Sequence, residues 1–294
     1  MLHEPYSLFE FPYRELLTTL LASPVERNAR TGREVFTLRG GAAFKLDLRA
    51  GWLPLSGLRQ LHPGTAAAEV AWFLSGERST AWLKRHCAIW EKFVEEGTDI
   101  VGAAYGYRWR RHFARDQVAL ALATLAVDPS DRRVYVSAWD PGRDGLGEPS
   151  KNVPCPLGFT LSMTQSPGGL TGHYELHSTL TIRSSDVFVG LPYDVMGHAI
   201  LMDVLRASLP QTVTLGTMTV ALGHPHLYRV HEQLASEALA AEPAGAMTLS
   251  KVPMLGSWPL AAVEADPDGF VEAYRKRTSE TEWPAYRCRP EVVS

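Results

Sequence analysis

The sequence has little cysteine, no long apolar run and no excess of positive charge. Its three cysteines, Cys87, Cys155 and Cys288, are odd in number and widely spaced, which fits neither a disulfide framework nor a CxxC metal site. No apolar stretch approaches the length of a membrane span. A formal net charge of -3 argues against a general nucleic-acid binder, which is normally basic. Together with an N-terminus that lacks a signal-peptide pattern, these absences predict a cytoplasmic protein that needs no membrane, nucleic acid or metal.

The sequence also lacks the glycine-rich loops that bind nucleotide cofactors. Neither GxGxxG nor a Walker A loop is present, so no dinucleotide or ATP site is indicated. There is no internal repeat, low-complexity tract or long linker either. We therefore expect one domain over residues 1–294.

Hydrophobic patterns predict a mixture of helices and strands. Helices are expected at residues 13–22, 65–76, 80–95, 116–126, 194–208 and 231–239. Strands are expected at residues 34–38, 43–48, 134–139, 159–163, 173–182 and 213–222. Thr65 is a candidate N-cap, Gly76 a helix stop, and Gly40 with Gly41 a turn. Because helices and strands do not alternate strictly, the order favours an α+β fold with a mixed sheet.

Cys155 stands between Pro154 and Pro156 at the start of an apolar run. Proline fixes φ and removes a backbone donor, so the sulfur lies at a stiff corner where a reactive group can be aimed. Free cysteine is also among the most buried residue types and is usually inert packing. Position alone leaves both interpretations open.

Glu69 and two clusters of basic residues each have a structural and a functional interpretation. Glu69 is a lone carboxylate in the apolar segment 65–76, where it is either paired with a neighbour or poised for proton transfer. Basic residues cluster at 108–115 and 131–133, as a solvated surface or as a site for a small anion such as phosphate.

The stretch RSSDVFVGLPYD (183–194) resembles the nucleotide-binding signature of the thymidylate synthase family, which reads R-S-x-D-x-F-L-G-L-P-F-N. Other segments match that family in order and spacing: NARTG (28–32), AEVAWFLSG (68–76), AIWEKF (88–93), YGYRWR (105–110), DRRVYVSAW (131–139), VPC (153–155) and HPHLYRVH (224–231). The resemblance runs from about residue 13 to residue 240 and weakens after that.

This resemblance implies a fold and a reaction. We expect a single α+β domain with a large mixed sheet flanked by helices, paired back-to-back in a homodimer. Residues 1–12 would be an N-terminal extension and about 241–294 a weakly matched C-terminal part. The implied co-substrate is 5,10-methylenetetrahydrofolate, and the implied substrate is a pyrimidine 5'-monophosphate.

The resemblance also assigns roles to residues. Cys155 matches the nucleophile that attacks C6 of the pyrimidine, while Glu69, acting through ordered water, and Tyr105 are the candidates for moving protons. The remaining roles are phosphate binding by Arg30, Arg183 and Ser184 with Arg132 and Arg133 from the partner subunit, ribose binding by His226 and Tyr228, and folate binding by Trp90 and Asp186. Nearby arginines would help to keep the thiol ionised.

One departure from the family decides the predicted substrate. Thymidylate synthases end the signature with Asn, whereas this chain has Asp194, as do the family's cytidylate and deoxycytidylate hydroxymethylases. A carboxylate accepts well from the 4-amino group of cytosine and can share a proton with N3, but it faces O4 of uracil lone pair against lone pair. A site built for one hydrogen-bond pattern rejects its inverse. Neutral drift from Asn in a uridylate enzyme is the alternative.

Two further departures from the family favour water over hydride as the last reactant. Pro156 replaces the family's histidine after the nucleophile, and Phe93 replaces a second tryptophan beside the cofactor. His198, one helical turn after Asp194, either orients that water or is simply packed. The predicted enzyme is therefore a 5-hydroxymethylase of CMP or dCMP, with CMP favoured by an Ala-, Gly- and Arg-rich composition typical of a cellular gene.

Two rival functions remain. The first is a thymidylate synthase that methylates dUMP and tolerates Asp194. The second is a non-catalytic relative that binds a nucleotide or RNA, although the nucleophile, Glu69, Tyr105 and all four arginines are present.

Overall fold

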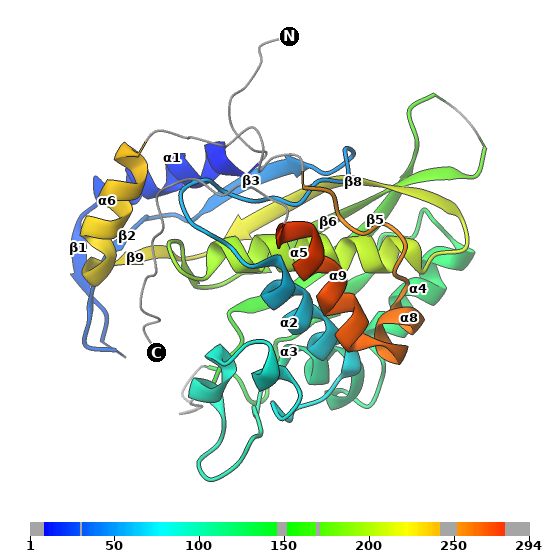
Figure 1. The fold of residues 1–294 in the computed structure, drawn as a ribbon, viewed down its shortest axis with the longest axis horizontal. Helices are drawn as coiled ribbons and strands as arrows, with labels where there is room; N and C mark the ends of the chain where they lie inside the picture. Colours follow the sequence, from blue (N-terminus) through cyan, green and yellow to red (C-terminus); the bar gives the residue numbers. More distant parts are fainter. Residues whose placement is uncertain (1–8, 30, 146–151, 169–170, 242–251, 280–294) are drawn as a thin grey trace.

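The computed structural model describes residues 9–29, 31–145, 152–168, 171–241 and 252–279 (Figure 1). Arg30 and Cys288 lie outside these ranges. The described strands form a five-stranded sheet, β3-β8-β6-β5-β4, and a four-stranded sheet, β1-β2-β9-β7. Their bounds are β1 Val25–Arg27, β2 Glu34–Thr37, β3 Ala42–Asp47, β4 Tyr135–Ser137, β5 Pro156–Gln165, β6 His173–Ile182, β7 Ser185–Asp186, β8 Thr212–Leu222 and β9 Pro225–Tyr228.

The large sheet is mixed, because β6 and β8 run parallel while the other neighbours run antiparallel. The described helices are α1 Glu10–Leu21, α2 Pro63–Ser75, α3 Tyr105–Tyr107, α4 Gln117–Val127, α5 Leu191–Ala207, α6 Glu232–Ala240, α8 Leu260–Ala265 and α9 Pro267–Ser279. The predicted α+β fold, with a large mixed sheet flanked by helices, is confirmed.

The small sheet continues the large one across a bend. β2, β9 and β7 lie side by side in the same order as β3, β8 and β6, which adjoin them in the chain. The N–H of Gly223 donates to the carbonyl oxygen of Ile182 across the bend, at 2.8 Å. Gly41 is needed there, since a Cβ would lie 2.5 Å from the carbonyl oxygen of Leu222. Residues 183–184, between β6 and β7, are therefore held at a fixed corner.

Alternate side chains give the large sheet an apolar face and a polar face. In β5, Phe159 and Leu161 are buried, whereas the intervening Thr160 and Ser162 are exposed, as the period of two in a strand requires. The corresponding partly exposed positions of β6 and β8 include Thr179, Thr181, Thr217 and Thr219. The polar face is thus rich in threonine.

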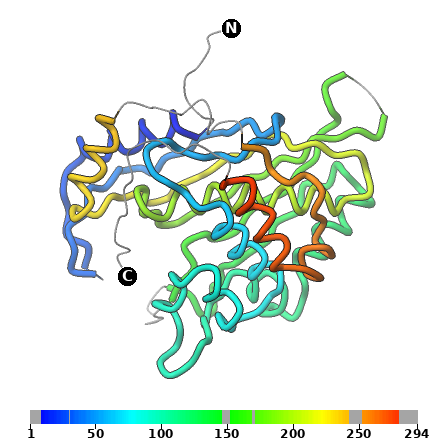
Figure 2. The backbone as a smooth tube through the Cα atoms, in the orientation of Figure 1, coloured from blue at the N-terminus to red at the C-terminus, as the bar shows by residue number. Residues whose placement is uncertain are grey.

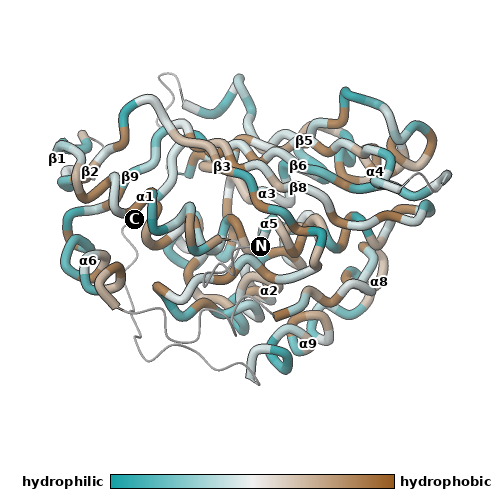
Figure 3. Tube along the Cα trace, turned by 90° about the horizontal axis from the view of Figure 1, so that it is seen from above, coloured by the Kyte–Doolittle hydropathy of each residue, from teal (hydrophilic) through white to brown (hydrophobic). Residues whose placement is uncertain are grey.

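Helices cover the apolar face in layers. Helix α5 packs on β6 and β8, α2 packs on α5, and α9 packs on α2 (Figure 1). In Figure 2 the orange-to-red end of the described chain runs back beside the cyan α2. Hydrophobic residues gather between the strands and these helices (Figure 3). The layers place α2, which carries Glu69, close to α5, which carries Asp194.

Helix α2 begins two residues earlier than predicted. Pro63 takes a position in its first turn, and His62 rather than Thr65 is the capping residue. Proline suits this position because its ring fixes φ and its missing N–H would have no intrahelical partner. The predicted stop is confirmed, because Gly76 adopts a left-handed conformation (φ 68°) after the last turn.

The helix predicted for residues 80–95 is wrong. Two short 3-10 turns, η1 (Leu83–Arg85) and η2 (Ile89–Phe93), take its place. The N–H groups of Thr80 and Glu95 donate to the carbonyl oxygens of Asp99 and Ile100, each at 2.8 Å. Backbone groups used in this way do not support a continuous helix, so tertiary contacts override the local propensity.

Candidate functional site

Cys155 lies directly before β5, on a loop that Arg183 holds at several points. The backbone N–H of Arg183 donates to the carbonyl oxygen of Cys155 at 2.9 Å. Its guanidinium donates to the carbonyl oxygens of Pro154 (2.8 Å) and Val153 (3.0 Å). The same group lies 4.0 Å from Cys155 Sγ. The half-buried sulfur therefore stands on a braced loop next to a fixed cation.

Tyr105 reaches the same loop from α3. The backbone N–H of Cys155 donates to its hydroxyl oxygen at 3.4 Å. Gly106 lets α3 approach α2 closely, because a Cβ there would lie 2.0 Å from the carbonyl oxygen of Phe73. Burial raises the pKa of Tyr105 well above its ordinary value, and negative charge on Cys155 and Asp194 adds to the effect. The phenol is thus protonated at neutral pH and its O–H is available as a donor.

Glu69 projects from α2 and has neutral donors as partners. Its Oε1 accepts from the indole N–H of Trp90 at 2.6 Å and from the thiol of Cys87 at 3.8 Å. Burial raises the pKa of Glu69 to about 7, and the two hydrogen bonds limit the rise. The carboxyl group can therefore give or take a proton near neutral pH.

Asp194 lies in the first turn of α5, which begins at Leu191, three residues earlier than predicted. Its backbone N–H donates to the carbonyl oxygen of Gly190 at 3.0 Å. The first turn of a helix favours an anion, but burial outweighs this and raises the pKa of Asp194 to about 8, with smaller contributions from the charges of Glu69 and Asp186. The side chain is a neutral acid at neutral pH.

Asp186, on β7, shapes the loop that leads to α5. Its Oδ1 accepts from the backbone N–H groups of Phe188 (3.1 Å) and Val189 (3.0 Å). Burial raises the pKa of Asp186, against these bonds and the nearby His226. The carboxyl group thus helps to fix the segment between β7 and Asp194.

His226 and Tyr228 lie two residues apart on β9, so their side chains share a face of the small sheet. Their ring centroids are 5.2 Å apart and the rings are nearly perpendicular, at 84°. The backbone N–H of Val187 donates to the carbonyl oxygen of His226 at 2.9 Å. This bond joins the strand of the predicted ribose ligands to the segment after β7.

The predicted phosphate ligands lie in different parts of the structure. Ser184 is partly exposed beside Arg183 at the bend, and Arg30 lies outside the described residues. Arg132 and Arg133 are exposed on the segment before the edge strand β4. The guanidinium of Arg133 is directed to Asp131, whose pKa it lowers by hydrogen bonding. The structure thus groups Arg183 and Ser184, and leaves Arg132 and Arg133 facing outward.

His198 is buried on α5, and its contacts favour the packed alternative. Its Nε2 lies 2.7 Å from the hydroxyl oxygen of Ser178, which donates to the carbonyl oxygen of Thr160 at 2.8 Å. The imidazole also meets the ring of Phe159 edge to face, with centroids 5.1 Å apart. Burial lowers the pKa of His198 to about 3, so the ring is neutral.

An aromatic cluster connects these groups, and the sequence interpretation did not single out its centre, Phe73. The Phe73 ring lies 5.8 Å from that of Trp90, 5.3 Å from that of Tyr105 and 5.5 Å from that of Trp109. Phe93 extends the cluster, with its centroid 5.8 Å from Trp90. The aromatic pattern of AEVAWFLSG was present in the sequence, but such stripes are typical of ordinary cores.

Trp139 and Cys87 were also missed. The guanidinium of Arg183 lies 5.7 Å from the Trp139 ring centroid, within cation–π range. Arg183 and Trp139 line a cavity of about 430 Å³ together with Tyr135, Ser137, Pro141 and Leu157. The sequence includes Trp139 in the DRRVYVSAW match, whereas nothing in the spacing of Cys87 links it to Glu69.

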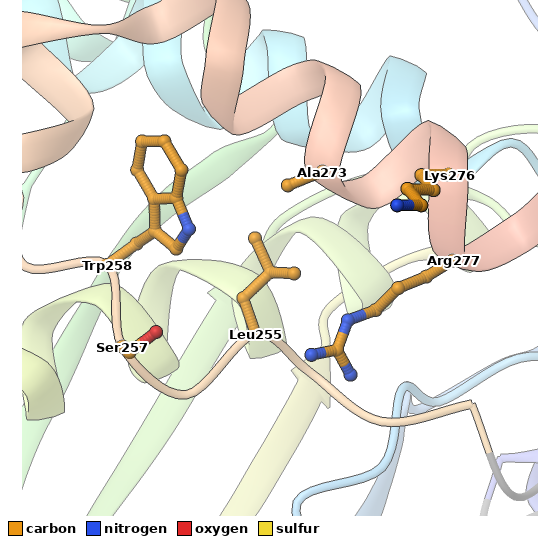
Figure 4. A pocket seen from close by; sticks show the side chains of 6 residues that line it. All are labelled: Leu255, Ser257, Trp258, Ala273, Lys276 and Arg277. Carbon is orange, nitrogen blue, oxygen red and sulfur yellow. The ribbon is translucent and has the colours of Figure 1, made fainter.

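A second cavity, of about 380 Å³, lies between α9 and the segment before α8 (Figure 4). Its lining residues are Leu255, Ser257, Trp258, Ala273, Lys276 and Arg277. It includes none of the predicted site residues, so we place the candidate active site at the Cys155 loop.

No cluster of three or more His, Cys, Asp or Glu side chains within the described ranges could hold a metal ion. No helix in those ranges has both the length and the apolar character needed to cross a bilayer.

Residues 11–257 match the sequence model of the family described as thymidylate synthase. The matched range includes the Cys155 loop, helices α2 and α5, which carry Glu69 and Asp194, and both sheets. It ends before α8 and α9.

Proposed function

The chain belongs to the thymidylate synthase family, and we propose that it is a cytidine-nucleotide 5-hydroxymethylase. Family membership makes it a folate-dependent pyrimidine one-carbon transferase, with methylenetetrahydrofolate as co-substrate. The finer assignment, which is ours, is hydroxymethyl transfer to CMP, with dCMP as the alternative. It rests on Asp194, a partly buried acid where a thymidylate synthase has an amide.

Cys155 starts the reaction in this proposal. Its thiolate adds to C6 of the pyrimidine, and the electron pair this displaces makes C5 nucleophilic. The guanidinium of Arg183, 4.0 Å from Sγ, stabilises the thiolate over the thiol. C5 then takes up the one-carbon unit, loses its proton, and is left with an exocyclic methylene as tetrahydrofolate departs. Water adds to that methylene, and breaking of the C6–S bond restores the ring and the free thiol.

Glu69 and Tyr105 move the protons. With a pKa of about 7, Glu69 can take up a proton and return it within one turnover, directly or through water. The Tyr105 phenol keeps its proton at neutral pH and lies beside the backbone of Cys155, so its role in this proposal is that of a hydrogen-bond donor to the group or water that carries the proton. Glu69 thus exchanges the proton, and Tyr105 supports the transfer.

The choice of cytosine as the base depends on the carboxyl group of Asp194. Cytosine presents an acceptor at N3 and a donor at the 4-amino group. The neutral acid, favoured by a pKa of about 8, offers one O–H donor and one carbonyl acceptor, which complement both positions and, with the two oxygens exchanged, N3–H and O4 of uracil as well. Discrimination comes from the ionised form. The ionised form still accepts from the 4-amino group, whereas against O4 of uracil it would set lone pairs against lone pairs. The site should therefore keep cytosine over a wider pH range than uracil.

The phosphate binds at Arg183 and Ser184, with Arg30, and with Arg132 and Arg133 from a partner subunit. Arginine forks suit a phosphate because they supply several charge-assisted hydrogen bonds. Two observations support a contribution across a homodimer. Arg132 and Arg133 face outward, and a cavity beside Arg183 and Trp139 leaves room for incoming side chains. The threonine-rich face of the large sheet is the surface we propose for the pairing.

The folate fits the aromatic cluster. Trp90, which is hydrogen-bonded to Glu69, and Phe93, whose ring is tilted by 59° to it, are partly exposed and give an apolar surface that suits a pterin ring. When bound, the folate supplies a one-carbon unit at the oxidation level of formaldehyde. Phe93 and Pro156 alter the pocket of a synthase, which supports water as the final reactant. Asp186 is proposed on the folate side, and His226 with Tyr228 at the ribose.

The test is a competition assay. The protein receives methylenetetrahydrofolate and equal CMP, dCMP and dUMP, and products are identified by mass spectrometry. We expect 5-hydroxymethyl-CMP and tetrahydrofolate, with dCMP as the weaker substrate. Thymidylate with dihydrofolate would identify a thymidylate synthase, and nucleotide binding without turnover would identify a non-catalytic relative.

A further inference from the structure

Both hydrogen bonds that the structure gives the Glu69 side chain within the described residues end on Oε1. Oε1 accepts from Trp90 Nε1 at 2.6 Å and from Cys87 Sγ at 3.8 Å. The Cys87 side chain is 8% exposed, and burial together with the charge of Glu69 raises the pKa of Cys87 to about 12. The thiol therefore keeps its proton and acts as a donor throughout the range in which Glu69 titrates.

The turn that carries Cys87 is held from outside by α9. The ring of His86 lies between two α9 residues: its Nδ1 accepts from Arg275, and its Nε2 donates to Asp268, each at 2.9 Å. A neutral imidazole satisfies both contacts in this tautomer. The N–H of Cys87 donates to the carbonyl oxygen of Leu83 at 2.8 Å, which closes the turn.

Helix α9 also packs behind Glu69. Val271 is fully buried in one cluster with Cys87, Ala68 and Trp72, and so lies against both the turn and α2. Gly64 allows the helices to approach, because a Cβ there would lie 2.5 Å from Cγ of Arg275. Residues 267–279 are outside the family-matched range, so this support belongs to the C-terminal part of this chain.

We propose that Cys87 is a positioning residue for Glu69: held by α9, its thiol and the Trp90 indole occupy Oε1 and leave Oε2 as the oxygen that exchanges protons in the site. An oxygen that accepts two donors is less basic than its neighbour, so the added proton goes to the other oxygen. The inference rests on the proposed function, because it gives Glu69 its direction of proton transfer.

The hydrogen bond from Cys87 also predicts the direction in which the pKa of Glu69 changes when the thiol is removed. A donor to the charged carboxylate lowers the pKa of Glu69, so removing the thiol must raise it. The other titratable groups that face this region are Tyr193 and Asp194, from α5. The charge of Cys87 contributes to the raised pKa of Tyr193, but only above the pH range in which Glu69 titrates, because the thiol keeps its proton there. His86, Asp268 and Arg275 remain on the outer side of the turn.

The experiment compares Cys87→Val with Cys87→Ser in the full-length protein. Valine replaces the thiol by a methyl group and adds a second methyl group on Cβ, whereas serine keeps a donor. The titration of Glu69 is followed in the free protein by carbon-13 NMR with labelled glutamate carboxyls, and Glu69→Gln identifies the signal. We expect the midpoint to move up by about 0.5 pH in the valine variant and to stay near its original value in the serine variant.

A second readout separates positioning from structural support. In the valine variant, the pH at which kcat for hydroxymethylation is half-maximal should rise in step with the NMR midpoint, while KM for the nucleotide changes less than about twofold. An unshifted NMR midpoint in a folded Cys87→Val protein, or in Cys87→Ala if valine does not fold, overturns the proposal. Because the titration needs no substrate, failure of CMP turnover would count against the proposed function alone.

Discussion

At the scale of single residues, burial determines the charge of the carboxyl groups in the site. Desolvation is the largest cause of the raised pKa at both Glu69 and Asp194. Among the described residues, neither group forms an ion pair with a cation. A carboxyl group that is removed from water without such a partner takes up a proton in preference to remaining charged. The chain thereby holds two acids that titrate near neutral pH, one on α2 and one on α5.

Their titration predicts how stability depends on pH. Both folded pKa values, about 7 and about 8, exceed the ordinary values of 4.5 and 3.8. The stability that each group contributes is therefore full below its ordinary pKa and is lost as pH rises through the folded value. We expect the free energy of unfolding of the free protein, from urea titrations, to fall between pH 6.5 and pH 9.

The control for this prediction is Asp194→Asn, which cannot ionise. Its free energy of unfolding should fall less over the same pH range than that of the original protein. The range starts at pH 6.5 because His198 acts in the opposite direction below it: its lowered pKa gives stability that is lost as pH falls from 6.5 toward 3. Equal slopes for both proteins would contradict the raised pKa of Asp194.

The same substitution tests base recognition. An amide offers the same donor and acceptor as the neutral acid, but it cannot pass a proton to N3 of cytosine and never becomes the anion that repels O4 of uracil. In Asp194→Asn we expect kcat/KM for CMP to fall by about 100-fold, because the proton that the acid shares with N3 is lost, and the preference to move toward a uridine nucleotide, which the amide does not repel. Steady-state kinetics with both nucleotides measures this. Equal losses for both would mean that Asp194 supports the fold rather than reads the base.

At the scale of elements, the contact of α3 with α2 places the Tyr105 hydroxyl. A Cβ at Gly106 would lie 2.0 Å from Phe73 O and 2.5 Å from Phe73 Cα, which are backbone atoms that cannot turn aside. We expect Gly106→Ala to cost about 1–3 kcal/mol of unfolding free energy and to lower kcat, since α3 must move away from the Cys155 loop.

A matched control is Gly197→Ala, within α5. A Cβ there would meet Val70 Cγ2 at 3.9 Å, an ordinary contact, and alanine inside a helix gains about 0.5–1 kcal/mol over glycine. Thermal unfolding of the two variants should therefore change in opposite directions. Similar stability in both would contradict the close approach of α3 to α2.

The elements differ in how far the sequence could predict them. Alternating patterns predicted β6 at its observed bounds and β8 to within one residue, because each has one face in the core. Residues 80–95 have helix-forming composition, but the bonds of Thr80 and Glu95 to the segment near Ile100 replace a helix by two turns. Local pattern fails where backbone partners come from elsewhere in the chain.

The same distinction applies to the site. Motifs at known spacing named Cys155, Glu69, Tyr105 and Asp194 from the sequence, and the structure brings these residues to neighbouring positions on the Cys155 loop, α2, α3 and α5. The contact between Cys87 and Glu69 depends on a turn and on α9, far away in the chain. No spacing rule connects them, so this contact could not be predicted.

At the scale of the whole molecule, the proposal requires two subunits for each phosphate site. Cys155→Ser and the double variant Arg132→Ala with Arg133→Ala should each be inactive alone. If the arginines act across the dimer, reassociation of the mixed subunits gives hybrids in which one site of two is intact, and about one quarter of the original activity returns. Activity that stays absent in verified hybrids would mean that the arginines act within their own subunit.

The central claim is that water, rather than hydride, completes the reaction on a cytidine nucleotide. The most direct measurement is turnover of CMP with methylenetetrahydrofolate in water enriched in oxygen-18, followed by mass spectrometry of the nucleotide and analysis of the folate. The account predicts a hydroxymethyl group that carries the heavy oxygen, with tetrahydrofolate as co-product. A methylated nucleotide without the label, together with dihydrofolate, would contradict it.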